Sequence, residues 1–196
     1  MPWVATITPE RQHEAGQLYL SGMSAQQVAD HLEVGLDATF YALRKQGIAR
    51  RTKTESNRLR FEAKALTYSI KNDLTIGEEN LKISAVMLYW AEGYKVGKTT
   101  VDFTNSDPDM VYLFVRFLRE ICGVDERKLR CFMYVYEGQD VNHLQDFWST
   151  LLQIPKMQFT KPYIKSAGVS KRGPRMHKGL VHVRYCDKKL LQQVLI

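Results

Sequence analysis

The mostly apolar run from Leu81 to Gly93 constrains the fold more than any other stretch of the chain. The run is long enough for a helix, and Thr75 and Glu78 ahead of it form the capping-box pattern that satisfies the free N–H groups of a first turn. Apolar side chains occur on nearly every side of that helix, at Ile83, Val86, Leu88, Tyr89 and Trp90. We therefore expect a buried helix that other elements cover on most sides.

One stripe of this helix carries small residues and ends in a carboxylate. Its members are Ser84, Leu88, Ala91 and Glu92. Small side chains there would let a second helix approach closely. Glu92 lies in the last turn, where the helix dipole disfavours an anion, and Gly93 follows as a natural stop. A cation or a metal would compensate this charge. The simpler alternative is an ordinary buried helix that ends in a solvated Glu92.

The segment Ala85–Gly93 resembles the signature helix of the LAGLIDADG homing endonucleases. Leu88, Ala91, Glu92 and Gly93 match, whereas Met87 stands where the family usually has glycine and Trp90 replaces its common first acid. In that family two such helices pack side by side, and each delivers its terminal acid to a divalent metal at the scissile phosphates. The resemblance implies that Glu92 is a catalytic residue and a Mg²⁺ ligand, and that the chain forms a homodimer through the helix at 81–92.

Length and composition fit a chain with a substantial core and without a membrane span. Hydrophobic residues make up 44% of the 196 residues, but no run reaches the roughly 18 apolar residues of a membrane helix. The chain shows no signal-peptide pattern. The three cysteines Cys122, Cys131 and Cys186 are far apart, which favours reduced, buried thiols in a cytoplasmic protein. The five histidines are scattered, so we expect no structural zinc.

Basic residues are concentrated in two segments of the chain. Residues 44–72 contain nine basic and two acidic residues, and residues 160–196 contain nine basic residues and one acidic residue. The segments 1–43 and 73–159 are each net acidic, while the whole chain carries a formal charge of +7. Clustering of this kind favours binding of a polyanion such as nucleic acid over a role in solubility alone.

Local signals predict three short helices at the start of the chain. Thr8 and Pro9 have the residue types that cap and begin a helix. Ser24 and Gln27 form a second capping-box pattern before the next helix, and the third helix is predicted to end at Gln46. Three helices with a tight turn between the second and the third have the helix-turn-helix layout.

The string Tyr19–Val34, with Tyr41–Ile48 as its close, resembles the resolvase/Hin class of helix-turn-helix proteins. The resemblance implies a DNA-binding domain at residues 1–48 whose third helix enters the major groove. Its outward residues are predicted to be Asp37, Ala38, Tyr41, Arg44 and Lys45. Tyr41 and Arg44 would reach base edges, and Lys45 would contact a phosphate. The alternative is a three-helix module that contacts proteins.

The basic residues continue into the segment 49–74, which is predicted to be a partly helical linker with a helix at residues 61–72. Its candidate DNA contacts are Arg50, Arg51, Lys53 and Arg58. The segment could track the DNA backbone or enter the minor groove, as recombinase arms do. It could also be a solvated linker that becomes ordered only on DNA.

Helices and strands are predicted to alternate in residues 75–196. Strands are expected at 98–105, 129–137, 158–165 and 180–186, and further helices at 110–121, 140–152 and 187–195. The chain is thus predicted to be α+β, with the helix-turn-helix followed by helices packed on a mostly antiparallel sheet. This fits a LAGLIDADG-like domain, whose open sheet face lies on the DNA. Only one clear strand follows the signature helix where the family has two, so no catalytic lysine or glutamine is carried over.

A basic segment at 165–178 lies between the last two predicted strands and contains five bases and no acid. Its glycines and its proline predict an irregular loop. Candidate phosphate contacts are Lys165, Lys171, Arg172, Arg175 and Lys178, and Lys98 at the start of the first predicted strand is a further one. Such a loop could lie along phosphates, which would make the affinity depend steeply on salt, or it could be simply solvated.

Three functional hypotheses follow. The first is a site-specific double-stranded DNA-binding protein of the LAGLIDADG homing-endonuclease type, which would cleave DNA with Mg²⁺ at Glu92 as a homodimer on a near-palindromic site. The second is a transcriptional regulator that binds DNA on the same scaffold without cleaving it. The third is a protein-interaction module, which leaves the two basic segments unexplained. We expect DNA binding, and we prefer cleavage to silent binding because Glu92 is retained.

Overall fold

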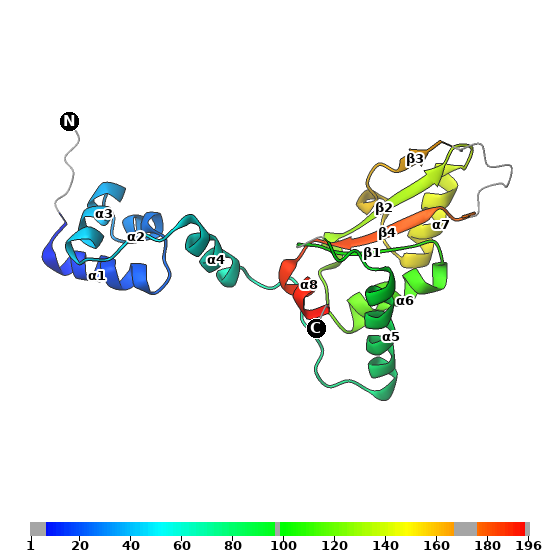
Figure 1. The fold of residues 1–196 in the computed structure, drawn as a ribbon, viewed down its shortest axis with the longest axis horizontal. Helices are drawn as coiled ribbons and strands as arrows, with labels where there is room; N and C mark the ends of the chain where they lie inside the picture. The colour runs from blue at the N-terminus through cyan, green and yellow to red at the C-terminus, as the bar shows by residue number, and fades with distance from the viewer. Residues whose placement is uncertain (1–6, 97–98, 167–175, 195–196) are drawn as a thin grey trace. The chain divides into compact units, whose positions relative to one another are not determined.

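A computed structural model of the chain describes residues 7–96, 99–166 and 176–194 (Figure 1). Contacts between residues divide the chain into two compact units, Met1–Ala65 and Leu66–Ile196, which we call the N-terminal and the C-terminal unit. The described residues form eight α-helices and a four-stranded mixed sheet, which confirms the predicted α+β class. None of the helices described is both long and apolar enough to cross a membrane.

The first three helices of the N-terminal unit pack around one small core. The helices of this unit are α1 (Pro9–Leu20), α2 (Ala25–His31), α3 (Leu36–Lys45) and α4 (Lys53–Ala63). The Thr8 side chain caps α1, and Ser24 and Gln27 form both halves of a capping box at α2, so the predicted helix starts are confirmed. The buried core consists of Ile7, Ala15, Tyr19, Val28, Leu32, Ala38, Ala42 and Leu43.

Two backbone positions determine how α1, α2 and α3 meet. Glu33, in the turn after α2, adopts a left-handed conformation with φ of 49°, and the chain reverses there before α3 begins. Gly16 lies where α1 crosses the end of α3, and a Cβ at this position would overlap the side chains of Gln46 and Ile48. This close approach explains a glycine inside a helix, where it usually costs about 0.5–1 kcal/mol relative to alanine.

The fourth helix ends earlier than the sequence predicts. α4 begins with a capping box at Thr52 and ends at Ala63, so the predicted helix at 61–72 is wrong. The chain that follows belongs to the C-terminal unit, where the Ser69 N–H donates to the carbonyl oxygen of Cys122 at 3.0 Å. This long-range pairing outweighs the local apolar stripe that predicted a helix there.

The sheet of the C-terminal unit has the strand order β1–β4–β2–β3. Its strands are β1 (Val101–Asn105), β2 (Leu129–Tyr136), β3 (Tyr163–Lys165) and β4 (Leu180–Tyr185). β4 pairs antiparallel with both β1 and β2, and β2 pairs parallel with β3. Gly93 also forms an isolated antiparallel bridge with Phe103 of β1, so the chain between residue 92 and β1 touches the sheet edge once.

Three long helices pack on one face of this sheet (Figure 1). They are α5 (Ile76–Glu92), α6 (Pro108–Glu120) and α7 (Val141–Leu152); the remaining helical segments are η1 (Glu126–Lys128), η2 (Lys156–Gln158) and α8 (Lys188–Val194). Alternate strand residues face the helices: Phe103 stacks on Phe114 of α6 with the ring centroids 4.4 Å apart. Trp148 of α7 is fully buried in the same core.

The other strand residues point away from these helices and form a surface that we call the open face. Its side chains, placed by strand alternation and by the cross-strand register, are Asp102, Thr104, Arg130, Phe132, Tyr134, Tyr136, Tyr163, Lys165, Leu180, His182 and Arg184. Successive side chains of a strand point to opposite faces of the sheet. The strand residues that are buried in the core therefore determine which residues lie on the open face.

The predicted starts of α5 and α6 are confirmed. Thr75 and Glu78 form both halves of a capping box, while the Asp107 side chain caps α6 with Pro108 at the start of the helix. Glu78 also accepts a hydrogen bond of 2.6 Å from Lys71. The hydrogen bond from Lys71, and to a smaller extent the one from the N–H of Thr75, lowers the pKa of Glu78 to about 2.

Candidate nucleic-acid interface

The outward face of α3 exposes the side chains that the sequence predicts for DNA contacts. Tyr41, Arg44 and Lys45 are all exposed, and Lys45 Nζ lies 5.9 Å from the centre of the Tyr41 ring. Asp37 is exposed in the first turn of the helix. The prediction that Ala38 faces outward is wrong, because Ala38 is buried in the core on the packed side of α3.

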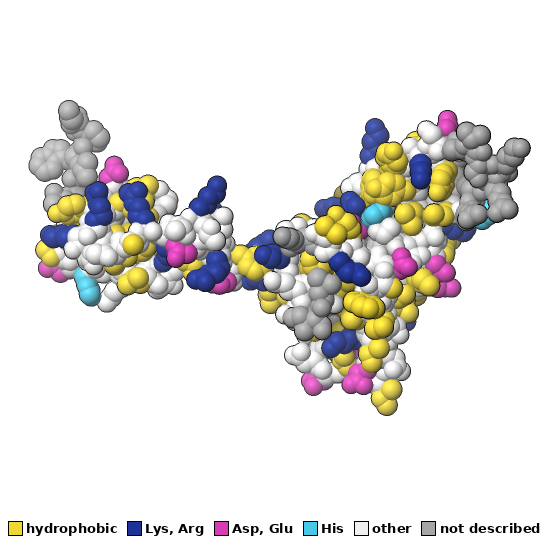
Figure 2. Space-filling model, in the orientation of Figure 1, with side chains coloured by type: hydrophobic (Ala, Val, Ile, Leu, Met, Phe, Trp, Pro, Cys, Tyr) yellow, Lys and Arg dark blue, Asp and Glu magenta, His cyan; other side chains and the backbone are white. Residues whose placement is uncertain are grey.

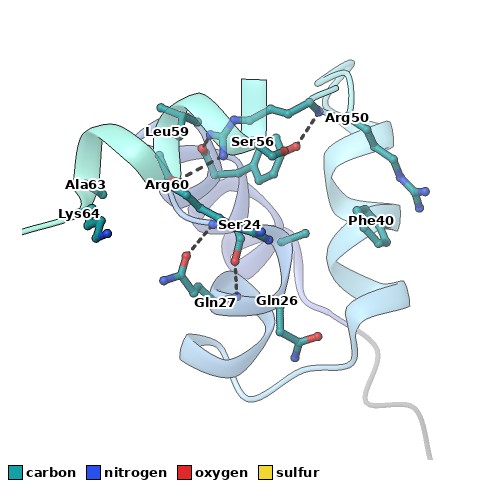
Figure 3. Close-up of a pocket in the computed structure, with 14 residues that line it drawn as sticks. Ser24, Gln26, Gln27, Phe40, Arg50, Ser56, Leu59, Arg60, Ala63 and Lys64 are labelled. Carbon is teal, nitrogen blue, oxygen red and sulfur yellow. Dashed lines mark hydrogen bonds between the residues drawn. The ribbon is translucent and has the colours of Figure 1, made fainter. Parts of the chain in front are cut away.

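Arg50 extends this basic surface beyond the end of α3. Its guanidinium carbon lies 3.5 Å from the centre of the Phe40 ring, a cation–π contact that fixes the side chain beside the helix. Both residues line an open groove of about 750 Å³ within the N-terminal unit (Figure 3). Lining residues from α2, α4 and their caps include Ser24, Gln26, Ser56, Leu59, Arg60 and Lys64. The groove lies between α4, which has no buried residue, and the three-helix core.

Arg51 has a structural role in the N-terminal unit, and its predicted contact with DNA stays a prediction. Its guanidinium lies over the ring of Tyr19, 4.0 Å from the centroid, and donates to the carbonyl oxygens of Tyr19, Gly22 and Met23. The Arg51 backbone N–H also donates to the hydroxyl of Tyr19 at 2.8 Å. These contacts tie the end of α1 to the chain that leads into α4.

The remaining basic candidates are divided between described and undescribed parts of the chain. Lys53 and Arg58 are exposed on α4, where Arg58 forms an ion pair of 3.7 Å with Glu62. Lys165 is exposed at the end of β3, and Lys178 Nζ lies 4.1 Å from the centre of the Phe147 ring. The other predicted contacts, Lys98, Lys171, Arg172 and Arg175, lie outside the residues that the structure describes.

The open face of the sheet is a second candidate surface, which the sequence analysis did not resolve into residues. Four rings form a cluster on it, with neighbouring centroids between 5.0 and 5.7 Å apart: Phe132, Tyr134, Tyr163 and His182. Arg184 lies over Phe132, and Arg130 is directly opposite Arg184. Figure 2 shows yellow and dark blue side chains together over the strands of this unit. Rings interleaved with cations are typical of nucleic-acid-binding sheets.

The sequence signal for this surface was the alternation within β2. Every second residue from Arg130 to Tyr136 is basic or aromatic, while the residues between them are buried. The partners that β4 contributes could not be identified in the same way. They depend on the register that places His182 opposite Phe132, and a single sequence does not contain that register.

A carboxylate within the open face orients two of its side chains. Arg184 Nε donates to Asp102 Oδ2 at 2.8 Å, and His182 Nδ1 lies 2.9 Å from Asp102 Oδ1. Burial alone would raise the pKa of Asp102, but the hydrogen bonds and charges of His182 and Arg184 outweigh it and hold that pKa below its ordinary value. Arg184 still has 39% of its side chain exposed and remains accessible to a ligand.

Glu92, the predicted catalytic residue and metal ligand, is exposed at the end of α5. Within the described ranges its carboxylate has no hydrogen bond or ion pair, and no group of three or more His, Cys, Asp or Glu residues there could hold a metal. One chain therefore offers one carboxylate at this point. Mg²⁺ is often held by one or two carboxylates together with phosphate oxygens and water, so Glu92 fits as a ligand only jointly with DNA or a second copy.

The side of α5 that is turned away from the core is apolar and uncovered. Ile83, Met87 and Trp90 are 63%, 57% and 67% exposed and lie on one stripe of the helix. The prediction that other elements cover α5 on most sides is therefore wrong for a single chain. An apolar groove of about 500 Å³ between α5 and α6 adjoins the stripe and is lined by Ser84, Met87, Leu88, Asp109, Met110 and Leu113.

The cysteines differ in their surroundings. Cys122 and Cys131 are buried as predicted, and burial raises the pKa of each thiol to about 12, which keeps it protonated and unreactive. Cys186 is exposed, so the prediction of a buried thiol is wrong for this residue.

The chain has been compared with models of known families, with curated proteins and with solved structures. None of these matches it.

Proposed function

We propose that the chain is a site-specific duplex-DNA-binding protein that reads its target with α3. The observation that carries this proposal is the outward face of α3, where Tyr41, Arg44 and Lys45 are exposed together while the opposite side of the helix forms the core. A helix fits the major groove, where an arginine can pair with guanine and a lysine can meet phosphate. The resemblance of the chain around α2 and α3 to the resolvase/Hin class supports the same docking.

Basic residues beside α3 support contacts to the DNA backbone. Arg50, which stacks on Phe40, and Lys53 at the start of α4 are exposed bases of the same unit. Phosphate contacts of this kind position a protein on DNA without reading its sequence. They also make affinity fall with salt, because each neutralised phosphate releases counterions.

The open face supports a second contact with nucleic acid. In the LAGLIDADG family, which α5 resembles, the open sheet face lies on the DNA. Here Arg130, Arg184 and Lys165 supply positive charge among the aromatic rings of that face. The isolated bridge between Gly93 and Phe103 supports the resemblance further, since it stands where the family has a second strand after its signature helix.

The uncovered stripe of α5 supports a homodimer in which two copies of this helix pack against each other. Ile83, Met87 and Trp90 would lose their exposure to water, and each buried side chain of this size contributes about 1.5–3 kcal/mol. The neighbouring Ser84 and Ala91 are small and exposed, so they permit close approach of the two helices. A second copy explains this stripe better than an unrelated partner does, because the helices of the family that α5 resembles pack together in pairs.

DNA cleavage is a second candidate function, and the exposure of Glu92 in the last turn of α5 favours it. Two Glu92 carboxylates from paired helices, with DNA phosphates, would hold Mg²⁺. The bound ion would supply Lewis-acid stabilisation of charge on the phosphate. The alternative is a catalytically silent transcriptional regulator on the same scaffold, for which α3 alone provides the specificity.

Selection of binding sites from a pool of random duplexes tests the main proposal. Wild-type protein should enrich one sequence, and a homodimer should enrich two inverted half-sites because its symmetry is twofold. An Arg44→Ala variant should lose preference at one base position of each half-site. Failure of wild-type protein to enrich any sequence would contradict the proposal, and a single unrepeated half-site would contradict the homodimer.

Nicking of a plasmid that contains the selected site separates cleavage from silent binding. Wild-type protein with Mg²⁺ is compared with Glu92→Gln, which retains the shape of the side chain and removes its charge. Loss of nicking in the variant, with binding retained, would assign Glu92 to catalysis. Binding without nicking by the wild type would favour the regulator, and equal nicking by both proteins would remove the assignment of Glu92.

A further inference from the structure

A pocket of about 300 Å³ lies on the open face at the C-terminal end of β2. Its lining residues are Tyr134, Val135, Tyr136, Tyr163, Lys165, Met176 and Leu180. Three of the seven are tyrosines, and they come from two neighbouring strands. The volume lies at the lower end of the roughly 300–1,000 Å³ typical of small-ligand pockets, so it suits one flat ring system.

The register between β2 and β3 creates this pocket. Tyr134 is paired with Tyr163, and Tyr136 with Lys165, so all four side chains emerge on the same face of the sheet. The rings of Tyr134 and Tyr163 are 5.3 Å apart at 66°, an edge-on arrangement in which one ring can offer its face to a third ring. Tyr163 is 54% exposed on the edge strand, so much of its surface is free to stack.

Charge narrows the class of ligand. Lys165 is the one charged residue among those that the structure describes as lining the pocket. Aromatic pockets can bind quaternary ammonium groups through cation–π attraction, but an ammonium at the rim repels such a ligand. The same ammonium attracts a phosphate. A neutral flat ring attached to a phosphate therefore complements both features of the pocket.

A nucleobase inside a duplex cannot enter such a pocket, because both of its faces are already stacked on neighbouring base pairs. Proteins that stack bases on aromatic side chains act on single strands, bulges or extruded nucleotides. We infer that this pocket binds an unpaired nucleobase, stacked on Tyr163 and Tyr136 with its phosphate at Lys165. The inference rests on the proposed function, in which the open face contacts nucleic acid. It adds that the nucleic acid bound there is unpaired, whereas α3 binds duplex DNA.

The test uses the full chain and fluorescein-labelled single strands of about 12 nucleotides, oligo(dT) and oligo(rU), a length within known single-strand site sizes. Anisotropy gives the dissociation constant. Tyr163→Ala should weaken binding by roughly 5- to 150-fold, the factor that corresponds to loss of one stacked base. Tyr163→Phe, which keeps the ring, should bind within about twofold of wild type, because stacking needs no hydroxyl. The ratio of the two affinities distinguishes a DNA from an RNA single strand as the ligand.

Ile164→Ala is the matched control. Ile164 neighbours Tyr163 on β3 and is similarly exposed, at 57%, but its register partner Val135 faces the core side of the sheet. This variant should bind both strands like wild type. Circular dichroism melting of each variant checks the fold, since β3 is a short edge strand that buries none of its residues.

Two outcomes would overturn the inference. The first is equal affinity of Tyr163→Ala and Ile164→Ala for both single strands. The second is failure of both strands to bind while a trimethyl-lysine peptide binds in a Tyr163-dependent manner. Binding of Arg44→Ala to duplex DNA is measured in parallel, so that the proposed function of α3 is tested independently of the pocket. Loss of duplex binding in Arg44→Ala alone, with Tyr163→Ala bound to single strands like wild type, would leave α3 as the reader and remove only the pocket.

Discussion

Arg184 of β4 and Asp102 of β1 lie directly opposite each other, and the guanidinium Nε donates to the carboxylate at 2.8 Å. This pair sits on the open face, where a buried carboxylate holds a half-exposed cation in place. Asp102 therefore orients a residue that we assign to nucleic-acid contact. Its own exposure is too low for direct contact with a ligand.

Replacing Asp102 with asparagine should destabilise the C-terminal unit by about 1–3 kcal/mol at pH 7, because partners of a buried carboxylate lose a charged acceptor. The folded pKa of Asp102 is lowered, so its contribution is present above the unfolded value of about 3.9 and is lost as the pH falls through the folded value. Urea unfolding of both proteins at several pH values measures the difference. The difference in unfolding free energy between wild type and Asp102→Asn should shrink below about pH 4. A difference independent of pH would contradict this account.

Changing Met87 to lysine should convert the protein from dimer to monomer without unfolding it. Met87 lies on the uncovered stripe of α5 and lines its groove, so a charge there would be buried in a dimer and solvated in a monomer. Light scattering coupled to gel filtration reports the mass. Met157→Lys, an equally drastic change at a 90% exposed residue of η2, should leave the mass unchanged. A monomeric wild type would refute the predicted dimer.

Gly93→Ala should destabilise the C-terminal unit by about 1–3 kcal/mol. The sequence predicts that Gly93 is a natural stop for α5, but its φ is −74°, which any residue adopts. Glycine is needed because a Cβ would overlap the backbone oxygen and the ring of Tyr89. Gly77→Ala in the first turn of the same helix meets open space and should instead stabilise by about 0.5–1 kcal/mol. Denaturant midpoints compare the two, and equal effects would contradict the steric explanation.

Arg51→Ala should lower the stability of the N-terminal unit by about 1–3 kcal/mol, because the carbonyl oxygens of Gly22 and Met23 lose the donor that Arg51 provides and that of Tyr19 keeps only the Gly22 N–H. Thermal unfolding followed by circular dichroism measures this loss. Arg58→Ala, on the exposed surface of α4, should change stability by no more than about 0.5 kcal/mol. If Arg51→Ala instead melts like wild type and binds DNA more weakly, the guanidinium contacts phosphate and our structural assignment is wrong.

Signals that lie within a few residues of each other could be predicted from the sequence. The caps at Thr8, Ser24, Thr75 and Asp107 all begin helices, because each cap satisfies N–H groups of its own first turn. The α+β class followed from the order of these elements. The exposed side of α3 was also predicted, apart from Ala38, since helical periodicity places one face outward.

Features that depend on distant partners could not be predicted. The helix expected at 61–72 failed because Ser69 pairs with the carbonyl of Cys122, far away in the sequence. In the sequence Arg51 is one of several bases in a charged linker, and its contact with the ring of Tyr19 is seen only in the structure. The aromatic pocket arises from the parallel register of β2 and β3, which no local pattern specifies.

The central claim is that α3 reads duplex DNA, and a comparison of Arg44→Ala with Lys45→Ala tests it most directly. Anisotropy measures the affinity of each variant for the selected duplex and for a scrambled one across a range of salt concentrations. Arg44→Ala should bind the selected duplex about 5- to 150-fold more weakly and lose discrimination, while Lys45→Ala should weaken both duplexes equally and reduce the salt slope by about 1. Arg127→Ala, which removes an exposed cation paired with Asp125 outside both surfaces, should match wild type. Equal losses in all three variants would contradict the account, because charge alone would then explain the binding.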